Sequence, residues 1–195
     1  MLFYINVQNR SKFEYQSPEG GKLTTVSKVT KKKWKADGGG VIGVDVRTKE
    51  NITKGGYVNE IVDVKGDLKS MQFKDESFDL IICNHVLEHI EDDRKALKEI
   101  YRVLKRGGIS ILQVPININR KKTFEDFNIT SHQEREKYFG QYDHVREYGL
   151  DFKDRIEEVG FEAEMLNYGE NFSKKMKIKY GLLENDLIPI AKKII

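Results

Sequence analysis

The chain has 195 residues, with 34 basic and 31 acidic side chains, a formal net charge of +3 and a hydrophobic fraction of 38%. This length suits one domain, and the balanced charge argues against a protein dedicated to coating DNA. No stretch approaches the roughly 20 apolar residues that a membrane span requires. The single cysteine, Cys83, excludes an intrachain disulfide and favours a cytoplasmic setting.

The first third of the chain carries weak signals for secondary structure. Residues 12–16 predict a short strand, and the stretch 21–36, rich in Thr, Val and Lys, predicts a helix. Residues 40–46 (GVIGVDV) predict a strand that ends in an acid, Asp45, and residues 58–64 are a further β-branched run.

The clearest pattern spans residues 78–116. Residues 78–83 (FDLIIC) are a short apolar run, typical of a strand that is buried on both faces. Residues 91–105 predict a helix, because apolar side chains recur at helical spacing, Lys105 and Arg106 suit its last turn, and Gly107 follows as a stop. Residues 109–116 predict a second strand. Together these elements indicate a right-handed parallel βαβ unit.

The C-terminal half continues the alternation of helices and strands. Within the polar stretch 117–148 we expect one helix at residues 131–139, and residues 150–159 predict another that stops at Gly160. Late strands are predicted at residues 161–168 and 187–195. This pattern predicts an open α/β sheet, in which ligands bind beyond the carboxyl ends of the strands.

Asp45 suggests a site for a nucleotide-type ligand. It ends a strand roughly 20-odd residues after the turn 17–21 (SPEGG), a spacing that lets a loop hold one end of the ligand while the acid takes two ribose hydroxyls. Taken alone, Asp45 is explained equally well as an acid that caps a turn.

Two longer stretches resemble one enzyme family. Residues 66–90 (GDLKSMQFKDESFDLIICNHVLEHI) and 96–108 (ALKEIYRVLKRGG) resemble class I S-adenosylmethionine-dependent methyltransferases, and more narrowly the type 11 group. Residues 134–149 and 154–161 are similar to an uncharacterised bacterial subgroup of these enzymes. The resemblance implies that residues 1–195 form a single Rossmann-like domain, a mostly parallel twisted sheet with helices on both faces and an antiparallel last strand. It also implies that residues 117–148 form a substrate lid.

The resemblance further implies how S-adenosylmethionine is held. Asp45 would bind the ribose, and Asp67 with the backbone of Leu68 would face the adenine. Asn84 and His85 would lie beneath the methionine end and the transferred methyl group. A cleft lined by acidic strand ends suits the positively charged sulfonium.

The chain departs from the family in the first glycine-rich motif, usually acid-x-Gly-x-Gly-x-Gly. Here residues 13–21 read FEYQSPEGG, similar to an Ala-Pro-Glu variant of the bacterial subgroup. We expect Ser17, Glu19 and Gly20 to contact the cofactor, with weakened binding because Pro18 removes one N–H donor. A catalytically degenerate protein that only binds S-adenosylmethionine or S-adenosylhomocysteine is the alternative. A dinucleotide-binding protein ranks last, because no Gly-x-Gly-x-x-Gly follows the first strand.

The histidines supply candidate catalytic bases, because a near-neutral imidazole can take a proton from a hydroxyl. We assign this role to His85 and His144. With Glu88 and His89 they also resemble the divalent-metal ligands of small-RNA 2′-O-methyltransferases, Glu-x-x-Glu-His plus a distant histidine. Because Leu-Glu-His is frequent in methyltransferases without metal, we predict a polar site that holds none.

The methyl acceptor has no recognisable motif in the sequence. Basic clusters at residues 31–35, 120–122 and 174–179 are compatible with RNA as the methyl acceptor, but a small molecule is favoured over nucleic acid or another macromolecule. The sequence therefore predicts a cytoplasmic enzyme that moves a methyl group from S-adenosylmethionine to an unidentified acceptor.

Overall fold

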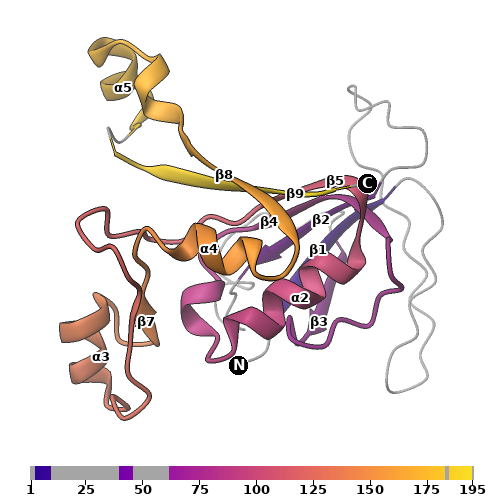
Figure 1. The fold of residues 1–195 in the computed structure, drawn as a ribbon, viewed down its shortest axis with the longest axis horizontal. Coiled ribbons are helices and arrows are strands. Elements are labelled where there is room, and N and C mark those ends of the chain that lie inside the picture. Colours follow the sequence, from indigo (N-terminus) through magenta and orange to yellow (C-terminus); the bar gives the residue numbers. More distant parts are fainter. Residues whose placement is uncertain (1–2, 10–39, 46–61, 183–184, 195) are drawn as a thin grey trace.

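A sheet of seven strands organises the part of the chain that the structure describes (Figure 1). The computed structural model describes residues 3–9, 40–45, 62–182 and 185–194. Across the sheet the strands follow the order β3-β1-β2-β4-β5-β9-β8. Their bounds are β1 (Phe3–Asn9), β2 (Gly40–Asp45), β3 (Val62–Gly66), β4 (Phe78–Cys83), β5 (Leu104–Ile111), β8 (Phe161–Asn167) and β9 (Leu187–Lys193).

Most strands of this sheet run in one direction. β2, β4 and β5 pair in parallel, and β9 lies antiparallel between β5 and β8. The predicted α/β sheet with an antiparallel last strand is therefore confirmed, but parallel pairing is limited to the central strands β2, β4 and β5, and the other described pairs are antiparallel. β1, for which the sequence pattern predicted no strand, runs antiparallel to both β2 and β3.

The predicted strands at residues 40–46, 58–64, 78–83, 161–168 and 187–195 correspond to β2, β3, β4, β8 and β9. The strand predicted at 12–16 and the helix predicted at 21–36 lie outside the described residues. A separate two-stranded sheet pairs β6 (Phe124–Glu125) with β7 (Arg146–Glu147), within the stretch 117–148.

Helix α2 (Asp93–Val103) connects β4 to β5, as the βαβ pattern predicted. The Asp92 carboxylate accepts a hydrogen bond from the Lys95 N–H and so caps its first turn. Its end was predicted wrongly, because Lys105 and Arg106 lie in β5 instead of the last helical turn. The reason is tertiary. The backbone of Leu104 is extended, its side chain is fully buried, and the residue pairs with Phe78 of β4.

Three further helices follow. The predicted helices at 131–139 and 150–159 are confirmed as α3 (His132–Phe139) and α4 (Phe152–Glu157). Ser131 caps α3 by accepting a hydrogen bond from the Glu134 N–H, and the helix ends at Gly140, whose φ of 83° places it in the left-handed region that glycine favours. Helix α5 (Lys174–Tyr180) was not predicted.

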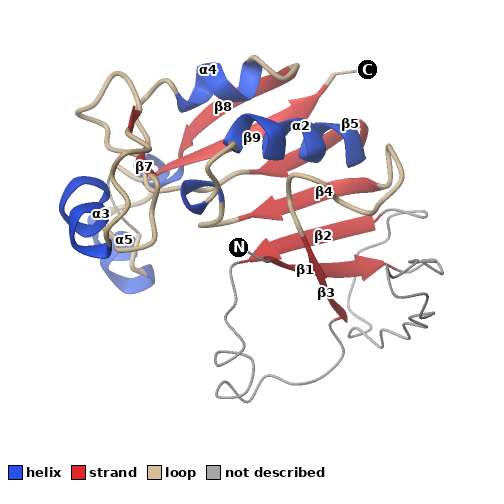
Figure 2. Cartoon of the chain, turned by 90° about the horizontal axis from the view of Figure 1, so that it is seen from below, coloured by secondary structure: helices blue, strands red, loops and turns tan. Residues whose placement is uncertain are grey.

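Helices α2 and α4 lie over the same face of the sheet (Figure 2). The apolar face of α2 buries Ala96, Leu97 and Ile100 in the core. Within the described parts of the chain, no helix is long and apolar enough to cross a membrane.

Candidate active site

The carboxyl ends of β2, β3 and β4 lie at one edge of the sheet. β2 and β4 pair in parallel as far as Val44 opposite Cys83, so Asp45 and Asn84 follow at neighbouring positions. Asp67 comes directly after β3, which is separated from β2 by β1 alone. The backbone therefore brings the acid and amide positions of the predicted cofactor site to the edge where α/β sheets bind ligands.

Asp67 and Leu68 form a tight turn at the end of β3. One oxygen of the Asp67 carboxylate accepts a hydrogen bond from the Lys69 N–H at 2.9 Å, and the Ser70 N–H donates to the Asp67 carbonyl, also at 2.9 Å. The Leu68 side chain is fully buried. The turn thus fixes the position of the carboxylate, which is partly exposed.

Asn84 and His85 follow β4. The Asn84 Oδ1 atom is buried and has no hydrogen-bond partner among the described residues. His85 adopts a φ of 53°, a left-handed conformation that is uncommon for residues other than glycine. Its N–H donates to the carbonyl of Gln113 at 2.8 Å, which ties the end of β4 to the segment after β5. The His85 side chain is 57% exposed.

The turn η1 (Leu87–His89) carries a buried carboxylate. Glu88 is 1% exposed, and its Oε1 lies 3.2 Å from Nδ1 of His85. Its other oxygen, Oε2, is buried without a hydrogen-bond partner in the described part of the chain. The Val145 N–H donates to the Glu88 carbonyl at 2.9 Å, so the stretch 117–148 docks on this turn.

His89 and His144 meet beside Glu88, with their ring centroids 4.8 Å apart and their planes at 78°. His89 Nδ1 lies 3.3 Å from the Asp143 carbonyl oxygen, and His144 Nδ1 lies 3.2 Å from that of Phe139. Burial lowers the pKa of His144 and the neighbouring His89 lowers it further, although the hydrogen bond to Phe139 opposes both.

The ligand atoms of Glu88, His89 and His144 all lie within 4.8 Å of one another, and we call these three residues the histidine cluster. The two predicted bases are therefore in different surroundings. His144 is 8% exposed and belongs to the cluster, whereas His85 is open to solvent at its margin.

A second buried group of charges lies beside the cluster and was missed by the sequence analysis. The Arg146 side chain is fully buried and donates hydrogen bonds to the carbonyls of Leu87, Ile90 and Glu91. Its Nε also donates to Glu125 at 3.0 Å. Nothing in the polar sequence around Arg146 signals this burial, because its partners are carbonyls of a distant turn.

Arg155 of α4 completes this group. It donates to Asp93 at 3.0 Å and to Glu125 at 2.9 Å, and the Tyr148 hydroxyl donates to Asp93 at 2.9 Å. We call Asp93, Glu125, Arg146 and Arg155 the arginine clamp. Burial raises the pKa of Glu125, but hydrogen bonds from Arg155 and Arg146 outweigh it and leave that pKa below its ordinary value.

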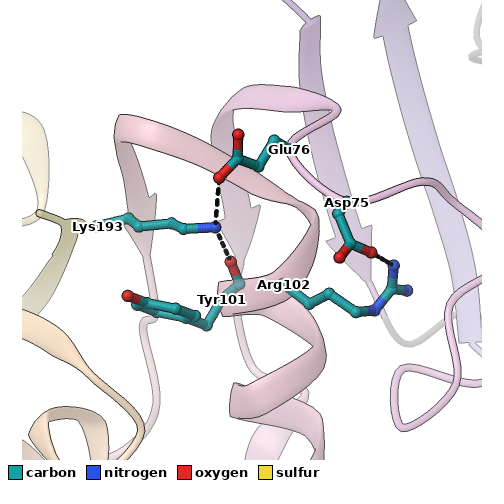
Figure 3. A pocket seen from close by; sticks show the side chains of 5 residues that line it. All are labelled: Asp75, Glu76, Tyr101, Arg102 and Lys193. Carbon is teal, nitrogen blue, oxygen red and sulfur yellow. Dashed lines mark hydrogen bonds and ion pairs between the residues drawn. The ribbon is translucent and has the colours of Figure 1, made fainter. Parts of the chain in front are cut away.

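A pocket at the opposite edge of the sheet is lined by Asp75, Glu76, Tyr101, Arg102 and Lys193 (Figure 3). Lys193 Nζ donates to the carbonyl of Tyr101 at 3.0 Å and lies 3.6 Å from Glu76, while Arg102 donates to Asp75 at 2.7 Å. The charged groups of this pocket thus pair with one another. The pocket lies near the start of β4, whereas the predicted cofactor site lies at the carboxyl end of that strand. The predicted contacts Ser17, Glu19 and Gly20 lie outside the described residues.

Residues 27–112 match the family described as "Methyltransferase domain". The chain is 44% identical to the uncharacterised methyltransferase YcgJ of Bacillus subtilis over 48 residues, 25% of this chain and 19% of the relative. It is 30% identical over 126 residues to the ubiquinone/menaquinone biosynthesis C-methyltransferase UbiE of Haemophilus ducreyi, which is 58% of this chain and 48% of the relative. The chain thus spans less than half the length of either curated relative.

Among solved structures, the crystal structure of YcgJ from Bacillus subtilis aligns with a TM-score of 0.37 at 19% identity. That alignment covers 65% of this chain and 66% of the other.

Proposed function

Because residues 27–112 match the methyltransferase-domain family, we propose that the chain transfers a methyl group from S-adenosylmethionine to an acceptor, which we take to be a small molecule. The observation that carries this proposal is the family match, which extends from before β2 to the end of β5. Those strands have their carboxyl ends at the edge where Asp45, Asp67 and Asn84 follow. A sheet of this kind binds its ligands at that edge.

The residues at this edge fit the cosubstrate chemically. A carboxylate accepts hydrogen bonds from two ribose hydroxyls, which suits Asp45. The buried Asn84 Oδ1 lacks a donor among the described residues, and an ammonium group such as that of methionine would supply one. The residues we propose to hold S-adenosylmethionine are Ser17, Glu19, Gly20, Asp45, Asp67, Leu68 and Asn84.

S-adenosylmethionine supplies an electrophilic methyl group on a positively charged sulfur. The work left to the chain is to orient the acceptor and to take its proton. His85 suits this role, because it follows β4 directly and its side chain is 57% exposed. His144 is buried and its Nδ1 is engaged by the Phe139 carbonyl, so we propose His85 alone on the acceptor side.

We propose that residues 117–148 act as the lid over the acceptor. This segment contains β6, α3 and β7, and it docks on the turn after β4 through Val145 and Arg146. Phe127, Tyr138 and Tyr142 of the segment are exposed, so their rings are available for contact with an acceptor.

Calorimetric titration with S-adenosylmethionine, S-adenosylhomocysteine, ATP and NAD tests the cosubstrate. We expect binding of the first two, weaker than is usual for the family. Asp75→Ala, at the opposite edge of the sheet, should leave this binding unchanged. Binding of ATP or NAD without S-adenosylmethionine would contradict the assignment.

A protein that binds S-adenosylmethionine without using it is the second candidate, and the replacement of the glycine repeat in residues 13–21 favours it. Mass spectrometry of S-adenosylhomocysteine, formed from S-adenosylmethionine in a metabolite extract, separates the two. Production above that of Asp45→Ala supports the enzyme. Binding with no production in any fraction supports the second candidate.

A further inference from the structure

The histidine cluster joins two segments that are far apart in the sequence. Glu88 and His89 come from the turn η1, and His144 comes from the stretch after α3. Across the residues that the structure describes, this is the one group of at least three His, Cys, Asp or Glu side chains placed to hold a metal ion. All three side chains are at least nine-tenths buried.

An unsatisfied carboxylate oxygen is the second observation. Glu88 Oε2 is buried and meets no hydrogen-bond donor in the described part of the chain. Leaving a charged oxygen buried without a partner is unfavourable, so such atoms in native proteins are paired with a donor or with a cation. A cation bound between Glu88 and the two rings would provide that partner.

The tautomers of both rings suit metal binding. A carbonyl oxygen accepts hydrogen bonds and cannot donate them, so Nδ1 of His144 carries the proton that faces the Phe139 carbonyl. The same reasoning applies to His89 and the Asp143 carbonyl. Each ring then presents its Nε2 lone pair. Histidines that ligate metals donate their other N–H to a carbonyl or carboxylate in this way.

We propose that Glu88, His89 and His144 bind a divalent transition metal, with Zn²⁺ as the best match. Two imidazoles and one carboxylate form a donor set that Zn²⁺ accepts, with a fourth position left for water or an acceptor oxygen.

The spacing of the ligand atoms allows this site. Bonds of about 2.0–2.2 Å in a tetrahedron put zinc ligands about 3.3–3.6 Å apart. The ligand atoms that the three side chains offer, one from each residue, lie up to 4.8 Å apart, so they need to close by a little over an ångström when a metal binds. The sequence analysis favoured a metal-free site because Leu-Glu-His is frequent in methyltransferases without metal, and the structure adds that His144 lies beside Glu88 and His89.

The test uses the full chain, first treated with EDTA and shown by circular dichroism to be folded, and then titrated with Zn²⁺ alone. We expect one equivalent to bind with a dissociation constant below about 1 μM. Co²⁺ should give the visible absorption of a tetrahedral site, and Zn²⁺ should displace it. Folded wild-type protein that binds neither ion would overturn the proposal.

Three variants localise the site. Loss of a direct ligand should weaken Zn²⁺ binding by more than about 100-fold, because even the loss of a group that only hydrogen-bonds to a ligand costs about 10- to 100-fold. We expect this for His144→Ala and for Glu88→Gln, which keeps the size and hydrogen-bonding capacity of the side chain. His132→Ala is the matched control, since His132 is an exposed histidine at the start of α3. Unchanged affinity in Glu88→Gln, or an equal loss in His132→Ala, would place the metal elsewhere and overturn the proposal.

Discussion

The arginine clamp and the histidine cluster are two buried polar groups that fasten residues 117–148 to the segment after β4. In the clamp, two arginines face two carboxylates, and Arg146 also donates to three backbone carbonyls. In the cluster, one carboxylate oxygen has no donor and two rings use one nitrogen each on a carbonyl. A group whose charges balance holds a structure together, whereas a group with spare acceptors has capacity for a cation.

The largest effect is expected from Arg146→Ala. It leaves Glu125 and Asp93 short of a cation and removes the hydrogen bonds to the carbonyls of Leu87, Ile90 and Glu91, so we expect a loss of about 3–5 kcal/mol in the free energy of unfolding. Urea denaturation measures this. Arg106→Ala, which removes an exposed ion pair with Glu76, should cost less than about 1 kcal/mol. Similar losses in the two variants would show that the clamp does not hold the fold.

The cluster should stabilise the fold only when a metal is bound. At a free Zn²⁺ concentration 100 times the dissociation constant, binding to the native state alone adds about 2.7 kcal/mol to the free energy of unfolding. Thermal unfolding of wild-type protein with Zn²⁺ and with EDTA measures the gain, which His144→Ala should abolish and Arg106→Ala should keep. An equal gain in His144→Ala would show that the histidine cluster does not bind the metal, and would contradict the difference we infer between the clamp and the cluster.

Cosubstrate binding should be separable from both groups. Asp45→Ala removes charge-assisted hydrogen bonds to two hydroxyls, and we expect S-adenosylmethionine to bind about 1.5–3 kcal/mol more weakly. Calorimetry measures this. The urea midpoint and the affinity for Zn²⁺ should not change, because Asp45 lies in neither group. An unchanged affinity for S-adenosylmethionine, with an intact circular dichroism spectrum, would remove Asp45 from the site.

The sequence predicts the elements whose signals are local. The unit β4–α2–β5 was recognised because the apolar runs of its strands and the helical spacing of apolar residues in α2 depend on residues a few positions apart. The end of α2 was not, because Leu104 joins β5 by pairing with Phe78, 26 positions earlier in the chain. β1 was not predicted for the same reason, because it forms by antiparallel pairing with β2 and β3.

The candidate site divides in the same way. The strand-end positions of Asp67, Asn84 and His85 follow from the strands that precede them. The burial of Arg146 and the approach of His144 to Glu88 depend on how residues 117–148 fold back on the turn η1. Hydrophobic periodicity carries no information on such polar long-range contacts, so sequence patterns cannot distinguish a buried arginine from an exposed one.

The smallest effect concerns the acid sensitivity of the clamp. Glu125 has a pKa below its ordinary value of 4.5, because hydrogen bonds from Arg155 and Arg146 outweigh the opposing effect of burial, so the unfolded chain takes up this proton more readily than the folded one. The ion pairs of Glu125 therefore contribute fully to the free energy of unfolding above pH 4.5. Their contribution falls as the pH drops through the lowered pKa of Glu125. Water screens the partly exposed carboxylate, which keeps the effect small.

Glu125→Gln isolates this contribution, because every other carboxyl group is present in both proteins. We expect the variant to be less stable than wild-type protein at pH 7, and the difference in urea midpoint to shrink as the pH is lowered below 4.5. A difference that stays constant with pH would mean that the Glu125 side chain acts through its shape and hydrogen bonds. In that case the clamp would not be held together by its balance of charge, and the difference that we infer between the clamp and the histidine cluster would be wrong.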